Sequence, residues 1–162
     1  MFELHRVRAE VEQFYAEHFH LLDAGDADAW AATFTPDGTF RAPTSTEPVR
    51  GRDALAAAVR RTAAELAAAG VVHRHWHGMV AVAPRTDGGS DGGGSDGGTD
   101  GAVLVRCYAL VFATPRGGAP SLHRTCVCED VLVRSGGRWL VASRAVTRDD
   151  MVQPVAAGAA TG

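Results

Sequence analysis

Cysteine, excess charge of one sign and long apolar runs are all scarce in this chain of 162 residues. It has 3 cysteines, and its 16 Lys and Arg residues nearly balance 19 Asp and Glu residues, which gives a formal net charge of −3. Near-balanced charge provides no basic surface for nucleic acid or for an anionic membrane. No apolar run approaches the roughly 18 residues that a membrane helix needs. We therefore expect no nucleic-acid partner and no membrane association.

The few cysteines also indicate a compartment. Cys126 and Cys128 are two positions apart, so they would share one face of a strand and are poorly placed to form a disulfide with each other. A small, odd number of thiols is typical of a reducing environment. The N-terminal sequence MFELHRVRAEVEQF is charged and amphipathic, unlike a signal peptide. These observations predict a cytoplasmic protein.

The sequence also lacks the motifs of common cofactor-dependent enzymes. It contains no phosphate-binding loop, dinucleotide fingerprint, nucleophile elbow or paired-cysteine zinc motif. We therefore expect no organic cofactor and no resident metal. A hydrophobic content of 46% suits a folded domain with a substantial core.

The order of the sequence patterns predicts an α+β fold. Apolar residues three and four positions apart predict a first helix from Leu4 to Leu22, and an alanine-rich segment predicts another that ends before Gly70. The predicted helices cover residues 4–22, 27–34 and 52–69. Beyond Gly70 the period changes to two. The predicted strands cover residues 39–42, 71–83, 102–113, 122–134 and 138–148. Helices followed by a long antiparallel meander indicate helices packed on one face of a curved sheet.

Residues 86–101, TDGGSDGGGSDGGTDG, interrupt the predicted sheet with a low-complexity segment rich in glycine and aspartate. Such a segment cannot bury apolar surface, which favours a flexible loop. A calcium-binding repeat is the alternative, because aspartate carboxylates suit a hard cation. Repeats of that kind need a regular apolar position in order to stack, and this segment has none.

The stretch LLDAGDADAWAATFTPDGTFRAP, followed by EPVRGRDAL, resembles the nuclear transport factor 2-like superfamily. More narrowly, it is similar to the SnoaL-like and scytalone-dehydratase-like branches. The resemblance covers residues 3–150 and implies a cone-shaped α+β domain, in which a curved, mainly antiparallel mixed sheet and three N-terminal helices enclose a pocket. We place this domain at residues 1–153, followed by a disordered tail at 154–162. The superfamily holds dehydratases, isomerases, cyclases and domains without chemistry, so the fold alone does not decide function.

The resemblance implies roles for individual residues. The dehydratase-like pattern has an Asp at the end of the first helix and a His early in the strand after the third, and these positions match Asp23 and His75. The second His of that pattern corresponds to Cys107, and its two tyrosines correspond to Leu22 and Ala42. Half of the dehydratase apparatus is therefore absent.

His73, His75 and His77 alternate along a predicted strand, so their side chains point to one side of the sheet. In one interpretation His75 is a general acid/base oriented by Asp23. In a second, the histidines bind zinc or iron together with a third, convergent ligand. In a third, they are solvated or interfacial residues on the outer face. Asp23 is unfavourable near a helix C-terminus, and such a local cost can mark function, although Asp23 could instead accept hydrogen bonds from turn amides.

Further side chains are candidates for the pocket wall. His18 interrupts the apolar stripe of the first helix, and it is either a hydrogen-bonded core residue or a pocket residue. The expected substrate-binding residues are His18, His73, His77, Cys107, Cys126 and Cys128. If Cys107 faces the pocket, Arg106 and Tyr108 face outward and become candidates for an interface.

These observations predict a cofactor-independent dehydratase, cyclase or isomerase that acts on a hydroxylated carbonyl compound of aromatic or polyketide type. His75 would transfer the proton and Asp23 would hold its tautomer, both as catalytic residues. The alternative is a non-catalytic ligand-binding or subunit-assembly module of the same fold, which the missing His and tyrosines favour. The resemblance also implies a homodimer that associates through the open face of the sheet.

Overall fold

The computed structural model describes residues 3–85 and 101–151. The helices are α1 (Leu4–Ala24), α2 (Ala27–Ala32) and α3 (Arg52–Ala69). The strands are β1 (Phe34–Arg41), β2 (Val49–Arg50), β3 (Val71–Pro84), β4 (Val103–Pro115), β5 (Ser121–Ser135) and β6 (Arg138–Arg148). Apart from Gly101, the expected glycine- and aspartate-rich loop lies outside the described residues, as does the expected tail at 154–162.

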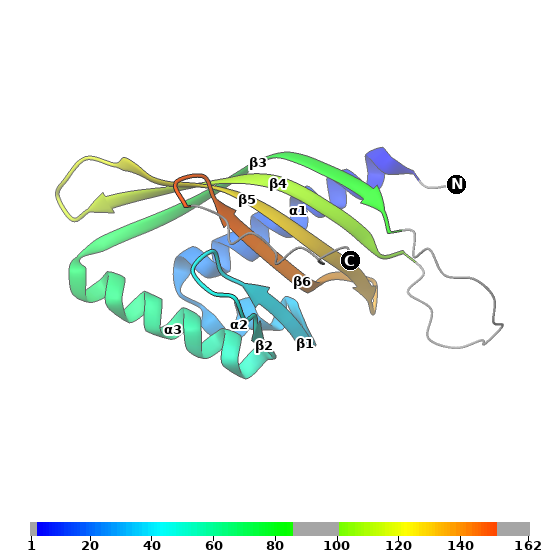
Figure 1. Cartoon of the computed structure of the whole chain (residues 1–162), viewed down its shortest axis with the longest axis horizontal. Coiled ribbons are helices and arrows are strands. Elements are labelled where there is room, and N and C mark those ends of the chain that lie inside the picture. Colours follow the sequence, from blue (N-terminus) through cyan, green and yellow to red (C-terminus); the bar gives the residue numbers. More distant parts are fainter. Residues whose placement is uncertain (1–2, 86–100, 152–162) are drawn as a thin grey trace, which may run out of the picture.

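The strands form an open, mixed sheet in the order β2-β1-β6-β5-β4-β3. The pairing of β1 with β6 is parallel, and the other neighbouring strands are antiparallel. Figure 1 shows the long strands β3 to β6 arching over α1 and α3. The predicted α+β fold, with helices on one face of a curved sheet, is confirmed. None of the helices in the described ranges is long and apolar enough to cross a membrane.

A glycine follows and ends each of the two long helices, two residues beyond the predicted end for α1 and at the predicted end for α3. Gly25 after α1 and Gly70 after α3 have φ angles of 72° and 64°, in the left-handed region that favours glycine. A Cβ atom on Gly25 would lie 3.3 Å from the Cβ of Ala63 in α3, so the close approach of the two helices also favours glycine. This cap fixes the end of α1, which carries Asp23.

The second helix and the first strand differ from the prediction. The helix α2 ends at Ala32, and β1 begins at Phe34 rather than at Thr39. Phe34 is fully buried and pairs with Val141 of β6, so its ring enters the core from a strand. The register with β6 shifts between Phe34 and Thr39, and a Cβ on Gly38 would lie 3.0 Å from the carbonyl oxygen of Val141. The Pro-Asp-Gly segment at residues 36–38 therefore lies at an irregularity within the strand.

The core lies between the sheet and the inner face of α1. The buried residues of α1 are Val11, Tyr15, His18 and Phe19. Val11 and His18 lie on the helix face that carries the predicted apolar stripe, whereas Tyr15 and Phe19 lie beside it. These two aromatic rings pack under the strands that carry the candidate site.

Candidate active site

Asp23 and His75 come from different elements and meet directly. Asp23 lies in the last turn of α1, and His75 lies in β3, 52 residues further along the chain. The Oδ1 atom of Asp23 lies 2.6 Å from Nδ1 of His75, and Oδ2 accepts a hydrogen bond of 3.0 Å from the backbone N–H of His75. A carboxylate only accepts hydrogen bonds, so Nδ1 is the donor and Nε2 is the ring nitrogen left for a ligand.

This pair opens into a cavity of about 910 Å³ between the helices and the inner face of the sheet. The side chains of His75 and Asp23 are 23% and 10% exposed, so both are accessible from the cavity. Most of the surrounding wall is apolar, and examples are Leu22 of α1, Val59 of α3 and Val111 of β4. Largely apolar cavities of this size with a few polar groups are typical of small-molecule sites.

Most of the residues proposed for the site line this cavity. They are Asp23, His73, His75, His77, Cys126 and Cys128. The three alternating histidines therefore share the inner face of β3. The ring of His73 lies 5.1 Å from that of the exposed His123, and burial together with the charges of His123 and Arg124 lowers the pKa of His73. His18 and Cys107 are not among the lining residues.

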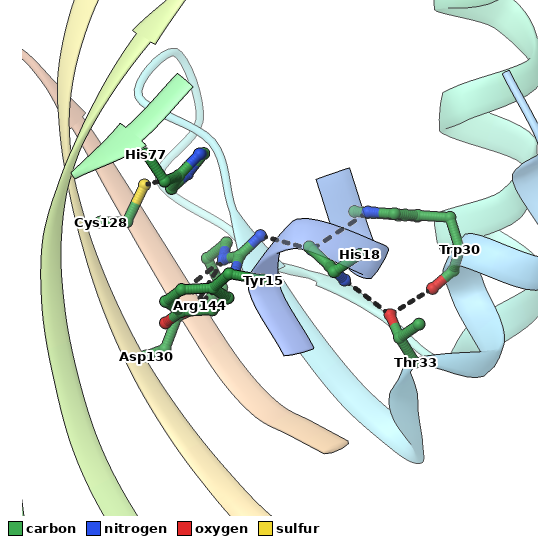
Figure 2. A network of polar contacts seen from close by, with 8 residues as sticks. All are labelled: Tyr15, His18, Trp30, Thr33, His77, Cys128, Asp130 and Arg144. Carbon is green, nitrogen blue, oxygen red and sulfur yellow. Dashed lines mark hydrogen bonds and ion pairs between the residues drawn. The ribbon is translucent and has the colours of Figure 1, made fainter. Parts of the chain in front are cut away.

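His18 is instead held in a closed hydrogen-bond network (Figure 2). Its Nε2 accepts from the indole N–H of Trp30 at 3.1 Å and from Nη1 of Arg144 at 2.7 Å. Because Nε2 accepts twice, Nδ1 carries the proton and donates to the hydroxyl of Thr33 at 2.7 Å. Burial lowers the pKa of His18 well below its usual value, and the charge of Arg144 acts in the same direction. His18 therefore joins α1, α2 and β6 as a neutral structural residue.

Cys107 is also a core residue. Its side chain is buried, and it lies opposite Cys128 in the register of β4 with β5. A hydrogen bond to Cys107 and burial raise the pKa of the Cys128 thiol, which is the one of this pair that reaches the cavity. Cys107 does not line the cavity, so the structure gives no support to the expectation that it contacts the substrate.

Beside the cavity lies a buried ion pair that sequence reasoning missed. The Nε–H of Arg144 donates to Oδ1 of Asp130 at 2.9 Å and Nη2 donates to Oδ2 at 2.6 Å, while the hydroxyl of Tyr15 donates to Oδ2 at 2.7 Å. Asp130 and Arg144 are both almost fully buried, and Arg144 also lines the cavity. One signal points to it: Asp130 shares the inward face of its strand with Cys126 and Cys128, and a buried carboxylate requires a partner.

Comparison with known proteins identifies the family. Residues 5–145 match the SnoaL-like domain. The chain belongs to the SnoaL-like family. This family includes polyketide cyclases and isomerases. No protein with curated annotation matches the chain.

Solved structures share the fold of this SnoaL-like protein over nearly their whole length. Aln2 from a Streptomyces species is 33% identical with a TM-score of 0.73, and 90% of this chain and 92% of that chain are covered. ActVI-ORFA from Streptomyces coelicolor is 30% identical with a TM-score of 0.75, with 90% and 97% covered. A protein from Catenulispora acidiphila in complex with S-DNPA is 35% identical with a TM-score of 0.71, with 90% and 95% covered.

In this SnoaL-like protein His77 lies deeper in the cavity than a solvated histidine would. Its ring stacks on Phe19, with centroids 3.4 Å apart and planes inclined by 17°. Burial lowers the pKa of His77 to about 2, and the charges of Arg144 and His75 add to this effect. Its Nδ1 is buried without a hydrogen-bond partner among the described residues, and its Nε2 lies 3.9 Å from Sγ of Cys128. His77 is therefore a neutral imidazole with unused hydrogen-bonding capacity.

The arrangement fits a metal ion poorly. In residues 3–85 and 101–151, the group of three donor atoms close enough to share an ion belongs to His77, Cys107 and Cys128, with the atoms within 4.8 Å of one another. Thiols must lose their protons to bind a metal, whereas the pKa of Cys128 is raised. The cationic Arg144 lies beside His77, which further disfavours a second cation.

Proposed function

We propose that the protein is a cofactor-independent dehydratase, cyclase or isomerase of a hydroxylated carbonyl compound, with His75 as its general acid/base. The observation that carries this proposal is the 2.6 Å contact between Asp23 and His75 within a cavity. A carboxylate bound to one imidazole nitrogen fixes the tautomer and stabilises the imidazolium that forms when the other nitrogen takes a proton. Membership of a family that includes polyketide cyclases and isomerases supports an enzyme of this class.

The proposed chemistry needs one proton carrier. Nε2 of His75 removes the proton next to the substrate carbonyl, and the electron pair of the broken C–H bond moves into an enolate. In a dehydration, His75 then returns this proton to the departing hydroxyl group, so that water leaves and a C=C bond forms. In an isomerisation, it returns the proton to another carbon. Asp23 keeps His75 oriented throughout.

The cavity supports an aromatic or polyketide-type substrate of small-molecule size. Its volume of about 910 Å³ and its apolar wall suit a fused-ring compound, and Phe19 and Trp30 are among the lining residues. The related Catenulispora acidiphila structure, which contains S-DNPA, supports binding of a small molecule in this fold. The low-dielectric wall strengthens each polar contact made with the reacting atoms.

Replacement of His75 tests the function. Purified protein is incubated with a panel of aromatic β-hydroxy ketones, and loss of substrate is followed by absorbance and mass spectrometry. We expect His75→Ala to lower kcat by about 100-fold to 10,000-fold, the usual contribution of a general acid/base. The matched control is His20→Ala on the exposed face of α1, which should retain wild-type turnover. Full turnover by His75→Ala would exclude the mechanism.

The alternative function as an assembly module has its own supporting observation. The outer face of the sheet exposes large apolar residues, including Trp76 at 66%, Tyr108 at 51% and Leu104 at 45%. Exposed patches of this kind are typical of interaction surfaces. We propose that this face pairs with a second copy of the chain. Light scattering of wild-type protein and Trp76→Arg tests the pairing: a dimer that becomes monomeric in the variant supports it, and a monomeric wild type excludes it.

A further inference from the structure

Arg144 has hydrogen-bond donors that the fold does not use. A guanidinium group carries five N–H groups. The N–H on Nε and one N–H on Nη2 donate to Asp130, and one N–H on Nη1 donates to His18. One N–H on each Nη atom is thus left without a described protein partner. The residue is only 3% exposed, yet it lines the cavity, so these donors are available to a ligand rather than to bulk water.

His77 offers a second unused hydrogen-bond donor. It lines the same cavity, and its buried Nδ1 has no partner among the described residues. Burial keeps the ring neutral, so it can present one N–H without competing for the proton that His75 transfers. A buried polar atom without a partner is costly unless a ligand completes it.

His77 and Arg144 pack against the same two aromatic rings, those of Phe19 and Tyr15. The guanidinium carbon of Arg144 lies 5.0 Å from the ring centroid of Phe19 and 5.7 Å from that of Tyr15. The ring of His77 stacks on Phe19 at 3.4 Å and lies 5.9 Å from that of Tyr15. Figure 2 shows the side chains of His77, from β3, and Arg144, from β6, on the same inner side of the sheet, although β4 and β5 lie between these two strands. Phe19 also stacks against His75 at 5.9 Å, which connects this donor cluster to the catalytic pair.

We propose that Arg144 and His77 form the subsite that binds the carbonyl oxygen of the substrate and stabilises the negative charge on it when the enolate forms. This inference rests on the proposed function and assigns an electrophilic subsite to it. When the C–H bond next to the carbonyl breaks, its proton goes to Nε2 of His75. The electron pair forms a C=C bond, and the π electrons of the carbonyl move onto its oxygen. The N–H groups of Arg144 and His77 donate hydrogen bonds to the resulting oxyanion. No oxidant or metal is needed.

The fold prepares Arg144 for this role. Asp130 holds the guanidinium by two of its nitrogens, and Asp130 is itself bound by Tyr15, so the spare donors have a fixed direction before a ligand arrives. Preorganised donors in a water-poor site stabilise developing charge more strongly than water does, because they need no reorganisation. A neutral imidazole can act as such a donor beside a cationic group.

A phenol that ionises in the site reports on these donors without any turnover. The probe is 4-nitrophenol, whose neutral and phenolate forms have different absorbance spectra. If the donors stabilise an oxyanion, the bound probe should ionise at least about one pH unit below the free probe, which corresponds to a preference of about tenfold for the phenolate. His77→Phe retains the stacking on Phe19 and removes the nitrogens, and it should abolish most of this shift. Arg144→Lys, which retains a charge beside Asp130, should weaken it as well.

The controls separate this subsite from the proposed function. His20→Phe makes the same chemical change on the exposed face of α1 and should leave the shift intact. His75→Ala should lose turnover but retain the shift of the bound probe, because His75 does not bind the oxygen. If His75→Ala keeps full turnover while the shift persists, the proposed function fails and the subsite stands. Failure of the wild type to bind the probe, an unshifted bound probe, or a full shift in folded His77→Phe overturns the subsite.

Discussion

Two histidines of this protein lie in opposite kinds of polar surroundings. His18 belongs to a network in which both ring nitrogens have protein partners, namely Thr33, Trp30 and Arg144. His75 has a protein partner for one nitrogen, Asp23, and faces a cavity with the other. The first arrangement is complete without a ligand. The second leaves one nitrogen for chemistry, which explains why two histidines of the same core should differ in function.

The comparison separates polar groups that hold the fold from polar groups that act on a ligand. Arg144 takes part in both, since it completes the network of His18 and also reaches the cavity wall. A closed network contributes to stability and should respond to mutation with unfolding. An open pair should respond with loss of turnover at nearly unchanged stability. Variants of the two regions therefore test the distinction.

The largest effect is expected in the closed network. Asp130→Ala leaves the buried guanidinium of Arg144 without its counter-charge, and removal of one partner from a buried ion pair typically costs about 3–5 kcal/mol. We expect the free energy of unfolding to fall by this amount in urea titrations followed by circular dichroism. The control is Glu12→Ala, which removes a carboxylate from the exposed pair with Arg8 and should cost under about 1 kcal/mol. Equal losses in the two variants would contradict a structural role for the network.

Mutation of the pair formed by Asp23 and His75 should instead lower turnover strongly and stability only slightly. Asp23→Asn keeps the shape of the side chain but offers an N–H to Nδ1 of His75, which favours the tautomer with the proton on Nε2 and so removes the base. We expect kcat to fall by about 100-fold or more. The free energy of unfolding should change by at most about 1.5 kcal/mol, because loss of a charge-assisted hydrogen bond is partly offset by removal of a negative charge from a helix C-terminus. Steady-state kinetics and urea titration on the same preparation measure both quantities. A variant that loses stability and retains kcat would assign Asp23 to the fold.

The sequence is sufficient to predict those parts of the site that depend on local sequence pattern. Alternation along a strand predicts that His73, His75 and His77 share a face, and the resemblance to the dehydratase-like pattern selects Asp23 and His75 as the pair. The structure brings these two together. Their use in catalysis remains a prediction, which the variants above test.

The ion pair between Asp130 and Arg144 cannot be predicted from the local sequence pattern. A regular hairpin built on the turn at 136–137 would place Asp130 opposite Ser143. The register shifts between Val131 and Leu132, and this irregularity places Asp130 opposite Arg144. A shift of one residue reverses the face of every side chain beyond it, so the position of Arg144 at the cavity depends on a bulge that no sequence signal marks. For a related reason, the sequence alone does not show whether His18 is a core residue or a pocket residue. Its partners come from distant elements, including α2 and β6.

The last prediction concerns the dependence of stability on pH, through the buried His18 and His77. The pKa of His18 is well below its usual value, and that of His77 is lowered to about 2, mainly by burial and with a contribution from Arg144. An unfolded chain has histidine pKa values near 6.5, so below that pH it binds protons that the native protein does not. Stability should therefore be constant with respect to these groups above about pH 6.5. It should fall as the pH drops further, by up to about 1.4 kcal/mol per pH unit for each histidine.

Removal of one of these histidines tests this pH dependence, because each histidine should account for one proton that the unfolded chain binds and the native protein does not. Urea titrations of wild-type protein and of His77→Phe between pH 7.5 and 5 measure the slope of the unfolding free energy against pH. His77→Phe should reduce this slope by close to one proton. The slope that remains in His77→Phe then includes the contribution of His18. An unchanged slope in His77→Phe would mean that His77 takes up a proton in the native cavity, and a protonated ring there could not serve as the neutral donor proposed beside Arg144.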